Sequence, residues 1–192
     1  YIFMQLISVI IRMTMSDILI HNLANRFRSY IEAARDSGFF AKDTFNCFPK
    51  GCCGDASCLL AEFMRSKGID SIYVWGEDNT GQTHAWLVVK DDRVTVPLPQ
   101  FLEIPDEIRT VLNSYSNEAY ATPVDISHYE EDDLENGLII DITADQFGEV
   151  PVYVDYIGGF HRRFEFQAAH DFEGLGDSRM IDLYKIIMQS SF

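Results

Sequence analysis

The chain has 192 residues, of which 47% are hydrophobic, and its 30 acidic residues outnumber the 15 basic ones to give a formal net charge of −15. A protein that binds nucleic acid needs a basic surface to contact phosphates, so this charge argues against a nucleic-acid partner. A chain of this length usually forms one domain around a single core.

The opening segment, residues 1–15, is apolar but too short to span a bilayer. It lacks the basic start and the small-residue cleavage site of a signal peptide. We therefore interpret residues 1–15 as a leader or extension of uncertain status and residues 16–192 as a single domain. The sequence predicts no membrane partner.

Apolar residues recur at helical spacing in three stretches of the chain. The first covers residues 16–37 and stops at Gly38, and the second covers residues 55–67. The third covers residues 177–189, close to the end of the chain. Each stretch predicts an amphipathic helix, and two of the three precede every predicted strand.

Short apolar or alternating runs predict strands over residues 71–75, 83–90, 138–142, 150–157 and 161–166. Turn-forming residues separate the first two runs and predict a hairpin. Helices followed by antiparallel strands indicate an α+β fold, with N-terminal helices packed on an antiparallel sheet. Region 91–137, with a short helix expected over residues 106–115, is interpreted as an insertion between two strands that shapes substrate access.

The four cysteines are Cys47, Cys52, Cys53 and Cys58. Their spacing does not resemble a secretory disulfide framework, so we expect reduced thiols and a cytoplasmic protein. It also does not match the paired ligands of a zinc site, and the sequence predicts no metal and no cofactor.

Cys53 is the candidate nucleophile, because it lies at the start of a predicted helix and between two glycines that permit close substrate approach. We expect Cys52 to pack behind the loop and Cys58 to be a small core residue. Asp55 could cap the helix, but its charge opposes a thiolate, so Lys50 and a protonated histidine would have to outweigh it.

His84 is the candidate base and Asp141 its orienting carboxylate, each within a predicted strand. A buried carboxylate is costly without a partner, and an imidazole on a neighbouring strand is a natural one. Two structural alternatives stay open: a core histidine bonded to a backbone carbonyl, and an aspartate that holds a turn at a strand edge.

Acyl transfer also needs hydrogen-bond donors for the developing oxyanion. The amide of Cys53 is one candidate, and the side chains of Asn46 and Gln146 are two others. Gln146 could equally belong to a capped turn after its strand. Trp86, two residues after the candidate base, is a further substrate-site candidate.

Three segments carry a resemblance to the transglutaminase-like superfamily: Gly51-Cys52-Cys53-Gly54-Asp55, Thr83-His84-Ala85-Trp86 and Ile140-Asp141-Ile142-Thr143. They are similar to that superfamily's Gly-x-Cys-x-Asp/Glu segment, its His-Ala-Trp strand and its Leu-Asp-Pro-Thr strand. The resemblance implies a papain-like fold in which Cys53 is the nucleophile, His84 the base and Asp141 the orienting group.

The sequence therefore predicts a thiol-dependent acyl-transfer enzyme of peptidase, amidase or deamidase type, acting on a peptide, protein or small amide substrate. One alternative is an N-acyltransferase that uses acyl-coenzyme A, although an acidic chain is less suited to a phosphate-rich donor. Another is a non-catalytic binding protein on the same fold.

Overall fold

The computed structural model describes residues 15–90, 129–134, 137–156 and 159–190. These residues form three α-helices and a five-stranded antiparallel sheet, which confirms the predicted α+β class. The opening segment up to residue 14 and the helix expected over residues 106–115 lie outside the described part of the chain. No helix among the described residues is long and apolar enough to cross a membrane.

The helices are α2 (Met15–Asp36), α3 (Cys53–Arg65) and α5 (Ser178–Gln189). Their bounds agree with the predicted stretches to within two residues. The one difference that matters is at α3, which begins at Cys53 instead of residue 55, so the candidate thiol belongs to the first helical residue. At α5, the carboxylate of Asp177 caps the helix by accepting from the amide of Met180 at 2.8 Å.

The sheet has the order β4-β3-β2-β1-β5. Its strands are β1 (Ile72–Glu77), β2 (Thr83–Val89), β3 (Leu138–Asp141), β4 (Tyr153–Tyr156) and β5 (Glu165–Asp171). The predicted hairpin of β1 and β2 is confirmed, and the carboxylate of Asp78 holds its turn by accepting from the amides of Thr80 and Gln82. Because β3 pairs with β2, region 91–137 connects two neighbouring strands, as predicted.

The strand predicted over residues 161–166 is wrong. Residues Phe160–Arg163 form a 3-10 helix, and the strand runs instead over Glu165–Asp171 at one edge of the sheet. His161 and Phe164 are buried while the two residues between them are exposed. That spacing of three fits a 3-10 turn and not the two-residue alternation of a strand.

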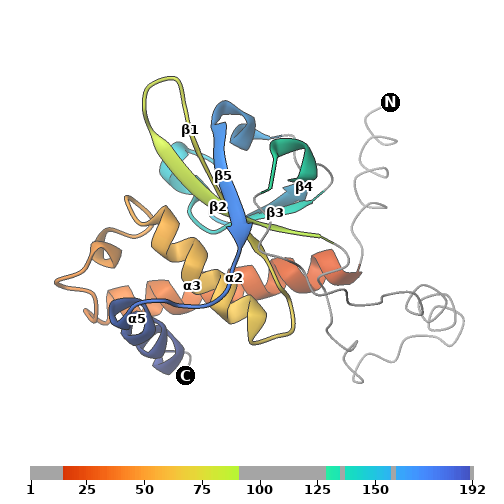
Figure 1. Cartoon of the computed structure of the whole chain (residues 1–192). Coiled ribbons are helices and arrows are strands. Elements are labelled where there is room, and N and C mark those ends of the chain that lie inside the picture. The colour runs from red at the N-terminus through yellow and green to blue at the C-terminus, as the bar shows by residue number, and fades with distance from the viewer. Residues whose placement is uncertain (1–14, 91–128, 135–136, 157–158, 191–192) are drawn as a thin grey trace, which may run out of the picture.

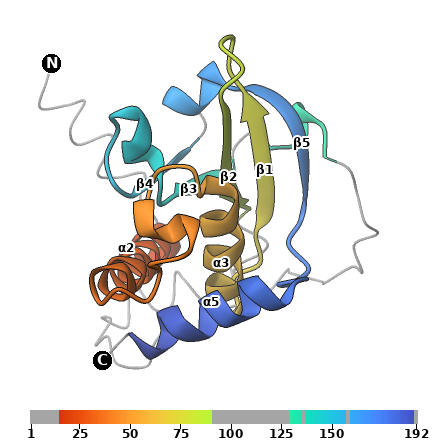
Figure 2. The same ribbon diagram turned by 90° about the vertical axis from the view of Figure 1, so that its left-hand side faces the viewer.

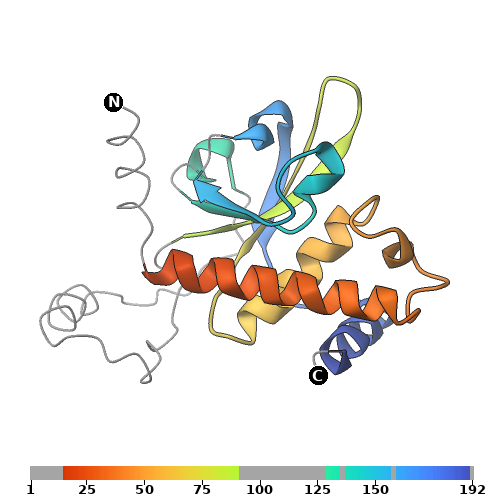
Figure 3. The same ribbon diagram turned by 180° about the vertical axis from the view of Figure 1, so that it is seen from behind.

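The sheet separates two apolar clusters. Helices α2, α3 and α5 lie together on one side of it (Figure 1), and in the view turned by 90° they stand beneath and beside the strands (Figure 2). From behind, α2 runs across the lower end of the sheet (Figure 3). Leu87, Val89 and Ile140 pack against these helices, whereas Trp86, Val88 and Ile139 pack on the opposite face, as strand alternation requires.

Candidate active site

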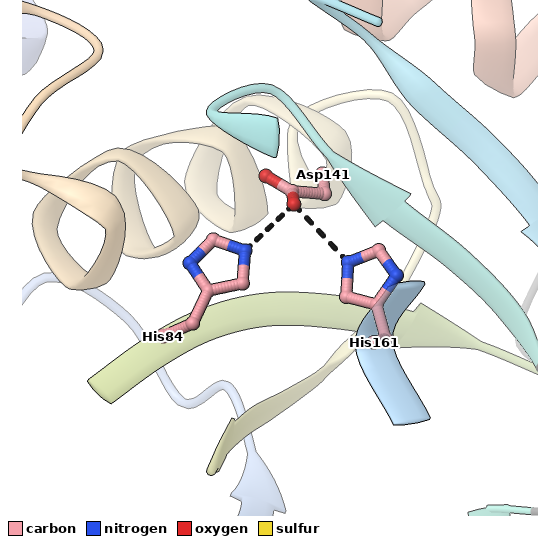
Figure 4. A group of neighbouring side chains, drawn as sticks. All are labelled: His84, Asp141 and His161. Atoms are coloured by element: carbon pink, nitrogen blue, oxygen red, sulfur yellow. Dashed lines mark hydrogen bonds and ion pairs between the residues drawn. The ribbon is translucent and has the colours of Figure 1, made fainter. Parts of the chain in front are cut away.

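His84 and Asp141 lie on adjacent strands, on the sheet face opposite the helices. His84 is the second residue of β2 and Asp141 is the last residue of β3. Each side chain is almost fully enclosed, with both residues 1% exposed. His84 Nε2 lies 2.7 Å from Asp141 Oδ2, the distance of a charge-assisted hydrogen bond (Figure 4).

Three further donors hold the Asp141 carboxylate. Its Oδ1 accepts from the amide of Thr143 at 2.7 Å and from the Thr143 hydroxyl at 2.9 Å. Its Oδ2 lies 3.1 Å from His161 Nε2. Burial works to raise the pKa of Asp141, but the hydrogen bonds and charges of the two histidines outweigh it and hold that pKa well below the ordinary value. Asp141 is therefore an acceptor of hydrogen bonds at neutral pH.

Cys53 is the first residue of α3, and its thiol interacts with the same histidine. Helix α3 packs on β1 and β2, so its first turn lies beside the start of β2. Burial works to raise the pKa of the Cys53 thiol. A hydrogen bond with the His84 side chain, the charge of that ring, and the amides of Ala85 and Gly54 outweigh burial and lower the pKa below its ordinary value.

His84 completes the pair as a cation. Burial favours the neutral ring, but the hydrogen bonds to Asp141 and Cys53 raise the pKa of His84 to about 8. Because Nε2 faces Asp141, Nδ1 is the ring nitrogen left for the sulfur. A lowered thiol pKa beside a raised imidazole pKa favours a thiolate–imidazolium pair at neutral pH.

The neighbouring cysteines have different surroundings. Burial, followed by the charge of Cys53, raises the pKa of Cys52 to about 12, and its sulfur donates to the carbonyl of Pro49. Burial likewise raises the pKa of Cys58 to about 11. Cys47 is exposed, in a 3-10 helix over Thr44–Cys47. All four thiols are free of disulfides.

Asp55 does not cap α3, contrary to one sequence-based expectation. The cap residue is Cys52, which makes no side-chain capping bond. Asp55 is bound instead by Arg179 of α5, whose Nη1 lies 2.8 Å from Asp55 Oδ2. The cation that offsets this charge beside Cys53 is thus Arg179, where the sequence had suggested Lys50.

The three remaining candidates lie in different places. Gln146 is half-buried in a 3-10 helix over Ala144–Phe147, and its Nε2 lies 3.5 Å from His84 Nδ1. Asn46 is exposed on the Thr44–Cys47 turn. Trp86 packs in the second apolar cluster, with its ring centroid 5.7 Å from that of His84. Only Gln146 therefore lies at the nitrogen that faces the sulfur.

Arg28 of α2 anchors the segment that carries Gln146. Its buried guanidinium donates to the carbonyls of Ile142 and Pro151 at 2.6 and 2.8 Å. It also forms a two-pronged ion pair with Asp145, at 2.9 and 2.8 Å. The turn beside His84 is thus fixed by a residue more than a hundred positions earlier in the chain.

Two hollows flank the site. A depression of about 440 Å³ opens onto Cys53, and its polar rim includes Asp43, Asp55 and Arg179. A second cavity, of about 480 Å³, lies against the second apolar cluster and touches Trp86 and His161. Cys53 lines the first hollow but not the second.

His161 is the residue that the sequence analysis missed. The sequence predicts it as part of an alternating strand, although the two arginines between His161 and Phe164 give a spacing of three, which is typical of a 3-10 turn. With His84 and Asp141 it brings three ligand atoms within 4.8 Å of one another, a spacing that could hold a metal ion. A ligating histidine normally donates its other ring nitrogen to a partner, but Nδ1 of His161 has none among the described residues. Direct hydrogen bonds therefore suit this donor set better.

No family model matches the chain, and no curated protein and no solved structure matches it either. The case for a function therefore rests on the geometry and electrostatics of the site.

Proposed function

We propose that this protein is a thiol-dependent acyl-transfer enzyme that hydrolyses an amide or ester through a thioester on Cys53. The observation that carries the proposal is the position of His84, whose Nε2 lies 2.7 Å from the buried Asp141 carboxylate and whose ring lowers the pKa of the Cys53 thiol. A structural histidine would need one partner. This ring has a buried carboxylate on one nitrogen and a thiol of lowered pKa on the other.

The groups suit each step of the reaction. The Cys53 thiolate attacks the substrate carbonyl carbon, and the resulting oxyanion collapses to a thioester as His84 Nδ1 gives its proton to the leaving nitrogen or oxygen. Neutral His84 then takes a proton from water, which attacks the thioester. The carboxylic acid leaves, and the thiolate and imidazolium are restored.

The amide of Cys53 and the side chain of Gln146 are proposed as donors to the oxyanion. The amides in the first turn of an α-helix have no acceptor within that helix, which suits the first of these roles. The Gln146 amide already lies beside Nδ1, where the tetrahedral intermediate would form.

Membership of the transglutaminase-like superfamily, with a papain-like arrangement, belongs to the same proposal. It is supported by the order of the three segments along the chain: a helix start, then two neighbouring antiparallel strands. A peptide, protein or small amide is the proposed substrate. A cytoplasmic location is also proposed, because the mechanism needs a reduced thiol.

Mapping the cysteine that reacts with iodoacetamide at pH 6 tests the nucleophile without knowledge of the substrate. An ordinary thiol with a pKa near 8.5 is only about 0.3% thiolate at that pH. We expect Cys53 to be labelled at least about tenfold faster than exposed Cys47, since its thiolate is already formed. Mass spectrometry of the digested protein reports both rates in one sample.

Turnover of an activated ester, p-nitrophenyl acetate, tests acyl transfer itself. The unmodified chain should release a burst of nitrophenolate equal to the enzyme concentration, which Cys53→Ala should abolish and Cys47→Ala should leave intact. Labelling of Cys53 no faster than that of Cys47, together with no burst from the unmodified chain, would indicate a binding protein instead. A burst that Cys53→Ala retains in full would overturn Cys53 as the nucleophile.

A further inference from the structure

Two histidines share one oxygen of the Asp141 carboxylate. His84 Nε2 and His161 Nε2 lie 2.7 and 3.1 Å from Oδ2, and the two rings approach the carboxylate from different sides (Figure 4). An ionised carboxylate only accepts hydrogen bonds, so both nitrogens carry a proton. His161 is 4% exposed and comes from the 3-10 helix that leads into β5.

The surroundings of His161 determine its charge and which ring nitrogen carries the proton. Burial, aided by the positive charge of His84, outweighs the bond to Asp141 and lowers the pKa of His161, so this ring is neutral. With its proton on Nε2, Nδ1 is a bare acceptor, buried without a partner among the described residues. An unmet buried acceptor is destabilising, and an apolar ring of similar size would avoid that cost. The hydrogen bond that this ring makes to a described residue is thus the one from Nε2 to Asp141.

We propose that His161 is a positioning residue of the proposed active site, which holds the Asp141 carboxylate ionised and aimed at His84 by donating from Nε2. This inference rests on the proposed function and adds a fourth member to its hydrogen-bonded chain. Asp141 is almost fully buried, and burial favours its neutral form. The bond from His161 opposes that tendency without competing for the sulfur.

The other groups around His161 do not supply this bond. Tyr153 of β4 presents its ring, 5.0 Å away between centroids, and Phe160 lies 4.1 Å away. The charge of Glu149 acts from a distance and is a minor influence. Three charged residues border the cavity that His161 also lines: Glu131, Asp132 and Arg162.

Substitution of His161 should change the titration of a thiol that it does not touch. Without the Nε2 donor, the carboxylate is less strongly ionised and less well aimed, so the His84 cation and the Cys53 thiolate are both stabilised less. We expect His161→Leu to move the pH dependence of Cys53 alkylation upward and to slow labelling at pH 6 about tenfold to a hundredfold, the range expected for a lost hydrogen bond to a charged group.

The experiment measures iodoacetamide labelling of Cys53 from pH 4 to pH 9 in the full chain and in four variants. His161→Gln keeps an amide N–H at about the place of Nε2, so its rates of Cys53 labelling should lie within about threefold of those of the unmodified chain. The asparagine side chain is shorter, so His161→Asn should label as slowly as His161→Leu. His170→Leu, on the exposed edge strand β5, is the matched control and should not change it. If the leucine variant does not fold, the glutamine and asparagine pair decides the question.

An unchanged profile in His161→Leu, or equal profiles in the glutamine and asparagine variants, would overturn the role of His161. Neither result would harm the proposed function as long as Cys53 of the unmodified chain still reacts fast at pH 6. If that thiol reacts slowly in every protein, the proposed function itself fails.

Discussion

Arg179 Nη1 donates to Asp55 Oδ2 across 2.8 Å, two residues beyond the candidate nucleophile. The same guanidinium bonds both oxygens of Asp43, at 2.9 and 3.0 Å. Hydrogen bonds to these two carboxylates raise the pKa of Arg179. Helix α5 thus ties the start of α3 to the preceding turn and pairs a cation with the carboxylate two residues after Cys53.

Removing this cation should make the thiolate less stable. In Arg179→Gln, Asp55 and Asp43 keep their charges but lose the cation that pairs with them, and we expect labelling of Cys53 at pH 6 to slow about two- to fivefold, as suits a solvent-screened pair. Lys185→Gln is the control, because Lys185 lies on the same helix and, within the described part of the chain, forms its ion pair with Asp182. Added salt should shrink the difference, and a salt-independent effect would point to a change of structure instead.

Turnover should fall on the alkaline side near pH 8. Acyl transfer needs the protonated His84 ring as the acid for the leaving group, and the pKa of His84 is raised to about 8 by its bonds to Asp141 and Cys53. The pH dependence of kcat/KM for p-nitrophenyl acetate measures the pKa values of the Cys53–His84 pair in the free enzyme. If the alkaline fall of kcat/KM stays near pH 8 in Asp141→Asn, it does not report His84, because the main cause of the raised pKa of His84 is gone in that variant.

The free energy of unfolding should depend on pH through Asp141 and His84, and the two residues should act at opposite ends of the pH range. The folded-state pKa of Asp141 is depressed, so its contribution is present above the unfolded value near 4 and is lost as the pH falls below it. The folded-state pKa of His84 is raised, so its contribution is complete below about 6.5 and is lost as the pH rises through about 8. Urea unfolding from pH 3 to pH 9 should show both losses, and Asp141→Asn should flatten the curve at both ends.

Much of this site could be predicted because its chemistry is local to short segments. A cysteine between glycines at a helix start, and a histidine and an aspartate inside apolar runs, are unusual enough to be recognised. His161 could not be placed in the same way. Its burial depends on a carboxylate 20 residues earlier and on a 3-10 turn that mimics a strand in sequence. Arg179 escaped notice because its partners lie more than a hundred residues away.

Substitution of Arg28 in α2 should cause a large loss in the free energy of unfolding. Its guanidinium satisfies two backbone carbonyls and Asp145, which Met could not do, so Arg28→Met should lower the free energy of unfolding by about 3 kcal/mol. Urea denaturation provides the measurement. Arg26→Met, two residues away on the exposed side of α2, should cost well under about 1 kcal/mol. Similar losses in the two variants would mean that helix propensity, and not the buried contacts, governs the effect.

Substitution by alanine distinguishes Gln146 from Asn46 as the donor to the oxyanion. The Gln146 amide lies 3.5 Å from His84 Nδ1, so once that nitrogen donates to the sulfur or the leaving group, the amide is free to donate to the oxyanion. We expect Gln146→Ala to lower kcat on p-nitrophenyl acetate about a hundredfold, with Cys53 labelling at pH 6 changed far less. Asn46→Ala, on the exposed turn, should change neither quantity. If Asn46→Ala is the variant that loses turnover, the acyl group must approach Cys53 from the side of the Thr44–Cys47 turn, and the oxyanion lies away from Gln146.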